Sequence, residues 1–197
     1  MVVHFLWIGN SKLPSEYQKG LQSFYSKHPH WKVNLWFQSD VEKILKTSKY
    51  SIERFTSFIN RYNFVKYHIL AQHGGWFVDL DIIWKKSLDE IIKDKVSKKP
   101  FPNLIVPVRT HPYSSINIKI NDDMLIYSDK ELFWELIDLC ESRTDYDPSL
   151  KYEPYGPVSL SRWIHSSDYS REFLYESEIQ KNGYYCEHKN LQSWKFS

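Results

Sequence analysis

The segment from Gly74 to Trp84 constrains the fold more than any other part of the sequence. It reads GGWFVDLDIIW, so two glycines precede an apolar run that is interrupted by Asp79 and Asp81. The run predicts a buried strand over 76–84, and the glycines predict the end of a preceding helix. Because side chains alternate along a strand, both carboxylates would share one face, with Cα atoms about 7 Å apart.

Two carboxylates in an apolar strand require compensation, because a buried and unpaired carboxylate costs several kcal/mol. A hard divalent ion such as Mn²⁺ or Mg²⁺ would provide it by joining Asp79 and Asp81 to a diphosphate. The alternative is a solvated strand end that carries two incidental acidic residues. The sequence pattern alone leaves both interpretations open.

The remaining segments alternate between helices and strands. A short helix is expected after Asp40, which would be its N-cap. Capping boxes at 87–90 and 128–131 predict two further helices, the second over 129–142. The other expected elements are strands over 2–8, 32–37, 104–108, 116–127 and 183–188 and helices over 14–27, 57–73 and 158–166. This order predicts one α/β domain over residues 1–197, with a central, mainly parallel sheet flanked by helices.

Charge and composition exclude several function classes. The net charge of +2 is small and evenly spread, so no nucleic acid is expected as a partner, and the lysines at 85–86 and 93–99 are interpreted as solvated surface. No apolar run approaches the ~20 residues of a membrane span, and the start lacks the basic region of a signal peptide. Cys140 and Cys186 suggest no disulfide framework. We expect a cytoplasmic protein (host cytoplasm if it is viral), either a monomer or a domain of a larger protein.

Residues 66–90, KYHILAQHGGWFVDLDIIWKKSLDE, resemble the sugar-binding DXD region of retaining glycosyltransferases with the GT-A fold. That family includes the initiating mannosyltransferases of yeast and the clostridial glucosylating toxins. The shared pattern is a helix, two glycines, a hydrophobic strand, the DXD motif and a helix that starts with Ser-Leu-Asp. The resemblance implies a GT-A nucleotide-sugar-binding fold. It also implies metal-dependent transfer of a hexose from a UDP-sugar to a glycan or protein-linked sugar acceptor, with retention.

The resemblance extends to both ends of the chain. Trp7, Ile8 and Gly9 match the end of the family's opening strand, which lies against the nucleobase, and Trp7 is the stacking candidate or else a core tryptophan. Near the C-terminus, Tyr155-Gly156-Pro157 resembles a late helix entry. The tail residues that resemble the segment closing over the diphosphate are His188, Ser193 and Trp194. His188 would then join Asp79 and Asp81 as a metal ligand, or else it is a surface histidine.

The helix before the glycines departs from the family pattern. Asn63 and Lys66 stand where the family has an aspartate and an arginine that contact the donor sugar and phosphate. Their spacing puts both on one helix face. An amide still bonds a sugar hydroxyl, and lysine remains a cation although it lacks the bidentate fork of arginine. The alternative is a solvated helix face.

Asp122 and Asp123 follow Asn121 where such enzymes place polar residues near the reacting sugar, although a turn explains them nearly as well. They are the first choices for the base of an inverting transferase. With Asp79, Asp81 and Lys66 they complete the residues expected in catalysis. Two further classes stay open at this point: a metal-dependent phosphohydrolase that uses the paired aspartates, and a carbohydrate-binding module that uses aromatic side chains alone.

Overall fold

The computed structural model describes residues 1–9, 12–45, 48, 52–55, 57–96, 99–110, 118–120, 125–142, 155–166, 168–169, 171–175, 179–180, 183–189 and 191. The elements in chain order are β1 (Val2–Trp7), α1 (Ser15–Lys27), β2 (Lys32–Phe37), α2 (Gln38–Leu45), η1 (Ile52–Arg54), α3 (Phe58–His73), β3 (Gly75–Val78), β4 (Ile82–Trp84), α4 (Leu88–Lys95), β5 (Leu104–Thr110), β6 (Ile118–Ile120), β7 (Leu125–Ser128), α5 (Phe133–Ser142), α6 (Pro157–Ser166), β8 (Arg171–Tyr175) and β9 (Cys186–His188). In this part of the chain, no helix combines the length and the apolar character needed to cross a membrane.

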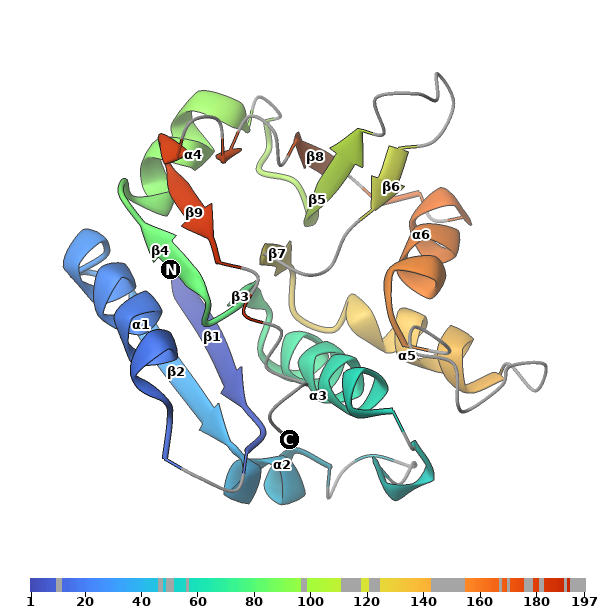
Figure 1. Ribbon diagram of the computed structural model, residues 1–197. Coiled ribbons are helices and arrows are strands. Elements are labelled where there is room, and N and C mark those ends of the chain that lie inside the picture. Colours follow the sequence, from blue (N-terminus) through green and yellow to red (C-terminus); the bar gives the residue numbers. More distant parts are fainter. Residues whose placement is uncertain are drawn as a thin grey trace.

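A seven-stranded sheet runs through the centre of the molecule in the order β2-β1-β3-β7-β5-β6, with β8 also paired to β5 (Figure 1). β1 pairs in parallel with β2 and β3, and β5 pairs in parallel with β8. β7 is antiparallel to β3 and β5, and β6 is antiparallel to β5. Five strands therefore point one way while β6 and β7 point the other, which confirms the predicted mainly parallel sheet.

The two faces of this sheet build two hydrophobic cores because successive strand residues point to opposite sides. On β3, Trp76 and Val78 join the core that contains side chains of α1 and α4. The intervening Phe77 joins the core that contains side chains of α2, α3, α5 and α6. Helices therefore cover both faces, which confirms the predicted α/β layering.

The paired glycines between α3 and β3 are required by the backbone. Gly74 ends α3 with φ 62° and Gly75 follows with φ 87°, and such values are rare for residues that carry a side chain. A Cβ at Gly75 would also lie 2.5 Å from Val2 Cγ1. The helix end predicted from the Gly-Gly pair is confirmed.

The predicted strand over 76–84 is wrong because the chain leaves the main sheet after Val78. Asp79, Leu80 and Asp81 form a turn, and the chain resumes as β4, which pairs with β9 in a separate two-stranded sheet. The Asp81 carbonyl accepts a hydrogen bond of 2.9 Å from the Lys189 amide, a contact outside the main sheet. The two aspartates thus belong to the turn segment after β3 and do not share one face of a strand.

Two predicted helix starts are also wrong. α2 begins before Asp40, whose Oδ2 instead accepts a hydrogen bond of 3.0 Å from the Phe37 amide. Ser128 ends β7 and donates its hydroxyl to the Asp129 carbonyl, and α5 starts only at Phe133. By contrast, the capping box at 87–90 is confirmed, with Ser87 and Glu90 bonded reciprocally. Of the strand predicted over 116–127, the described residues lie in β6 and β7, and 116–117 and 121–124 lie outside the described part of the chain.

Candidate active site

The DXD turn lies at the edge of the sheet where the parallel strands β1 and β3 end. Val3 and His4 pair with Trp76 and Phe77, so β1 and β3 run side by side toward this edge. Asp79 follows directly after β3. Ligands of open α/β sheets bind outside the carboxyl ends of such strands. The turn is therefore placed where a site of this fold class is expected.

Three predicted metal ligands converge at this edge. Asp79 and Asp81 each offer a carboxylate oxygen and His188 offers a ring nitrogen, and these three atoms lie within 4.8 Å of one another. The pairing of β4 with β9 produces this convergence, because it sets Ile82 opposite His188. The His188 side chain is 6% exposed, so it is not a surface histidine. Carboxylate oxygens with one imidazole nitrogen make a donor set that suits Mn²⁺.

Asp81 is held by two contacts to the C-terminal part of the chain. Its Oδ1 lies 3.1 Å from His188 Nε2, and its Oδ2 accepts a hydrogen bond of 2.9 Å from the Leu191 amide. Burial alone would raise the pKa of Asp81, but the bonds from His188 and Leu191 outweigh burial and lower the pKa below its ordinary value. Asp81 is therefore an anionic group fixed by contacts to the tail of the chain.

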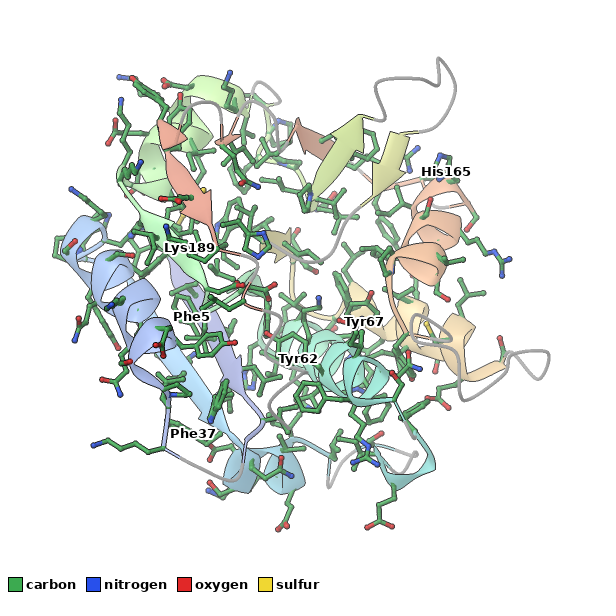
Figure 2. All side chains as sticks on the ribbon, viewed as in Figure 1. Phe5, Phe37, Tyr62, Tyr67, His165 and Lys189 are labelled. Atoms are coloured by element: carbon green, nitrogen blue, oxygen red, sulfur yellow. The ribbon has the colours of Figure 1, made fainter. Side chains whose placement is uncertain are left out.

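Tyr62 lies on α3 (Figure 2). It bonds the other aspartate and was not anticipated from the sequence. Its hydroxyl donates a hydrogen bond of 3.1 Å to Asp79 Oδ1. The tyrosine ring packs edge-on against Phe77, with 6.0 Å between ring centroids. Because Phe77 belongs to β3, this packing fixes the hydroxyl relative to the strand that carries Asp79.

The two residues that depart from the family pattern are buried, so the alternative of a solvated helix face is wrong. Lys66 is 1% exposed and Asn63 is 4% exposed. Lys66 Nζ lies 5.7–5.8 Å from the ring centroids of Tyr62, Tyr67 and Phe77, an aromatic surrounding that attracts a cation. Asn63 Nδ2 donates to the Tyr155 carbonyl at 3.4 Å. The two side chains therefore lie inside the protein, with Lys66 beside the tyrosine that bonds Asp79.

The predicted base-binding residues end β1 at the same sheet edge. Trp7 is 8% exposed, and its ring lies against Tyr17 with 5.0 Å between centroids. A Cβ at Gly9 would lie 2.7 Å from the Trp7 ring, so the chain passes directly over the indole there. Ile8 is partly buried against the core on the opposite face of the sheet. Trp7 thus contributes to a core, and its stacking on a base stays a prediction.

Four of the predicted site residues lie outside the described part of the chain. They are Asp122, Asp123, Ser193 and Trp194. Their roles therefore stay predictions.

The chain is similar in sequence to known glycosyltransferases. Residues 14–98 match the family described as "Glycosyltransferase sugar-binding region containing DXD motif". An uncharacterized glycosyltransferase of Acanthamoeba polyphaga mimivirus is 25% identical over 97 residues, covering 46% of this chain and 39% of that protein. Inositol phosphoceramide mannosyltransferase 3 of Schizosaccharomyces pombe is 24% identical over 156 residues, covering 69% of this chain and 44% of that protein. The chain thus spans less than half the length of these two relatives.

Solved glycosyltransferases share the fold. GlyE of Streptococcus pneumoniae superposes with a TM-score of 0.52 at 15% identity, over 91% of this chain and 46% of GlyE. The PaToxG glycosyltransferase superposes with a TM-score of 0.50 at 16% identity, over 82% of this chain and 66% of PaToxG. The fold is therefore the GT-A fold. Together, the sequence match and the fold make this chain similar to glycosyltransferases of the DXD type.

Proposed function

We propose that this protein transfers a hexose from a UDP-sugar to a glycan or protein-linked sugar acceptor, in a reaction that needs Mn²⁺ or Mg²⁺ and retains the anomeric configuration. The observation that carries the proposal is the convergence of Asp79, Asp81 and His188 at the end of β3. The two aspartates lie inside the region that matches the sugar-binding family. Two carboxylates and an imidazole from distant parts of the chain provide the hard and intermediate ligands that such an ion accepts.

In the proposed complex each group has a distinct task. Asp81 and His188 would hold the ion, which would replace the hydrogen bond that now joins them. Asp79, oriented by Tyr62, binds the ion or the ribose. Trp7 is assigned to the base because it ends β1 beside the DXD turn. Lys66 contributes buried positive charge next to Tyr62, where it favours the diphosphate of the donor.

The transfer breaks the bond between the anomeric carbon and the diphosphate oxygen. Asp79, Asp81 and His188 would hold a divalent ion, which would supply Lewis-acid stabilisation of the charge on the leaving diphosphate. The acceptor hydroxyl oxygen bonds to the same carbon from the same face, and its proton passes to the departing phosphate oxygen. This route needs no carboxylate base from the protein. Anomeric analysis of the product by NMR tests it, because an inverted product would assign the base to a carboxylate such as Asp122 or Asp123.

Uridine diphosphate should stabilise the protein strongly with Mn²⁺ and weakly with a chelator. A ligand at 100 times its Kd raises the free energy of unfolding by about 2.7 kcal/mol, which shifts the Tm of a chain of this size by ~5–10 °C. Thermal unfolding with uridine, guanosine and adenosine diphosphates measures both the metal effect and the base preference. Equal shifts with Mn²⁺ and with chelator would contradict the metal bridge.

Removing the Tyr62 hydroxyl should weaken metal binding without unfolding the protein. Tyr62→Phe keeps the ring that packs on Phe77 but leaves Asp79 Oδ1 without this donor. Loss of a group that orients a metal ligand typically lowers metal affinity ~10-fold or more, which titration calorimetry with Mn²⁺ and uridine diphosphate measures. Tyr185→Phe is the matched control, because it removes a tyrosine hydroxyl that bonds Asp94 instead. Equal affinities for both variants would show that Tyr62 does not orient Asp79 for the metal.

A further inference from the structure

Helix α1 carries no predicted metal ligand, yet α1 and the residue that caps its C-terminus contact the backbone of residues 80–88 at three successive places. The contacting residues are Gly20 and Ser23 of α1 and the cap residue His28, which together we call the docking face of α1. They meet the backbone near Leu80, at Trp84 and at Leu88. Figure 1 shows α1 lying along β4.

The first contact fixes the backbone on both sides of Asp81. A Cβ at Gly20 would lie 1.9 Å from the Leu80 carbonyl oxygen and 3.1 Å from the Ile82 carbonyl oxygen. Both distances are below ordinary van der Waals contact, so the turn approaches the helix to a distance that only glycine permits. Helix propensity alone would favour alanine at this position. The absence of a side chain at Gly20 is therefore explained by the position of the DXD turn.

The second contact is a hydrogen bond to β4. Ser23 Oγ accepts from the Trp84 amide at 2.9 Å and donates to the Gly20 carbonyl at 2.7 Å. The pairing of β4 with β9 sets Trp84 opposite Cys186 and Ile82 opposite His188. A displacement of β4 from α1 would therefore move the strand that carries the third metal ligand.

The third contact holds the start of α4. His28 Nδ1 donates to the Phe24 carbonyl at 2.8 Å, so Nε2 is free to accept the Leu88 amide at 2.6 Å. Leu88 is the first residue of α4, and its amide has no acceptor within its own helix. The docking face thus contacts the chain just before Asp81, within β4 and at the start of the next helix.

We propose that the docking face of α1 positions the metal ligands, so that Gly20 and Ser23 control the spacing between Asp81 and His188 although neither touches metal or substrate. This inference rests on the proposed function for the identity of the ligand, Mn²⁺ with uridine diphosphate. The positional claim concerns the protein alone and can be measured without metal.

The test compares two pairs of variants in α1. Gly20→Ala and Ser23→Ala alter the docking face. Lys19→Ala changes an exposed neighbour, and Ser26→Ala removes a hydroxyl that bonds only the carbonyl three residues earlier, as Ser23 also does. The first pair should bind Mn²⁺ with uridine diphosphate on the order of 10-fold more weakly, the scale found for residues that orient metal ligands. The second pair should bind as the wild type does.

Amide hydrogen exchange of the metal-free protein provides the second readout. The docking-face variants should lose protection at 82–84 and 186–188 while β1 and α3 keep theirs. The proposal would be overturned if both docking-face variants showed the hydrogen exchange and the Mn²⁺–nucleotide affinity of the wild type. It would also be overturned if they lost amide protection evenly over the whole chain. If Gly20→Ala does not fold, the same two measurements on Ser23→Ala and on its control Ser26→Ala decide whether the proposal holds. If the wild type does not bind Mn²⁺ with the nucleotide, the proposed function fails, and the exchange pattern still decides the positional claim.

Discussion

Replacing Asp81 with asparagine is expected to abolish Mn²⁺-dependent nucleotide binding and to lower kcat by on the order of 10³-fold. The estimate follows because a metal that stabilises the leaving group contributes several kcal/mol, and each 1.36 kcal/mol corresponds to a factor of ten. Asparagine has the shape of aspartate but removes the negative charge. Asp81 accepts hydrogen bonds from His188 and from the Leu191 amide. The side-chain amide nitrogen of asparagine would face one of these two donors and could not accept its hydrogen bond.

The fold should survive this substitution, because the turn keeps its backbone bond between Lys189 and residue 81. Circular dichroism and titration calorimetry on the same sample separate folding from binding. Asp94→Asn is the matched control, since Asp94 also accepts a hydrogen bond, from Tyr185, but lies outside the three ligands. Full activity of Asp81→Asn would remove Asp81 from the metal site.

Acidification from pH 7 to pH 4.5 is expected to lower the free energy of unfolding by several kcal/mol. Burial lowers the pKa of both His4 and His68 from the ordinary value of 6.5 to about 4. Between pH 6.5 and about pH 4, the two histidines are protonated in the unfolded chain but stay neutral in the folded chain. The free energy of unfolding therefore falls as the pH falls through this range. For each histidine, this lowering of the pKa corresponds to a loss of ~2–3 kcal/mol in the free energy of unfolding at pH 4.5.

The hydrogen bonds of His4 explain why its neutral form is preferred. Its Nε2 donates to the Gly74 carbonyl at 3.0 Å, while its Nδ1 accepts from Trp36 Nε1 at 3.1 Å. A proton on Nδ1 would face that indole donor. His4 therefore links the start of the main sheet to the Gly-Gly turn before β3, and its protonation would loosen both.

Urea unfolding at several pH values measures this acid effect. His68→Gln should flatten the pH dependence, because glutamine does not titrate in this range. His165→Gln is the matched control, since His165 bonds the carbonyl four residues earlier just as His68 does, but it is exposed. A free energy of unfolding that stays constant between pH 7 and pH 4.5 would contradict the prediction.

The parts of the site that depend on short-range patterns could be predicted from the sequence. The end of α3 follows from the Gly74-Gly75 pair, and the α/β class follows from the order of apolar runs. The family resemblance also predicted His188 as a third metal ligand, and the structure places His188 beside the two aspartates. These features depend on local conformation or on a motif that is continuous in the sequence.

The parts that depend on distant contacts could not be predicted. The strand over 76–84 is broken because Asp81 bonds residues more than a hundred positions away and because the turn packs against Gly20. No local signal marks that break in an apolar run. Tyr62 likewise contacts Asp79 through the packing of α3 on β3, which the helix sequence alone does not encode. The capping box expected at Ser128 failed because this residue ends a strand paired within the sheet.

The separation of the metal ligands along the chain has a consequence for synthesis on the ribosome. Asp81 bonds Leu191, 110 positions later, and β4 pairs with a strand at 186–188. At ~5–20 residues per second, about 5–20 s pass between the synthesis of Asp81 and that of Leu191. During that interval β1, β2 and α1 are already available, whereas β4 lacks its partner and Asp81 lacks its two donors. The nascent polypeptide is thus expected to acquire its scaffold first and its capacity to capture a metal ion only after residues 186–191 have been made.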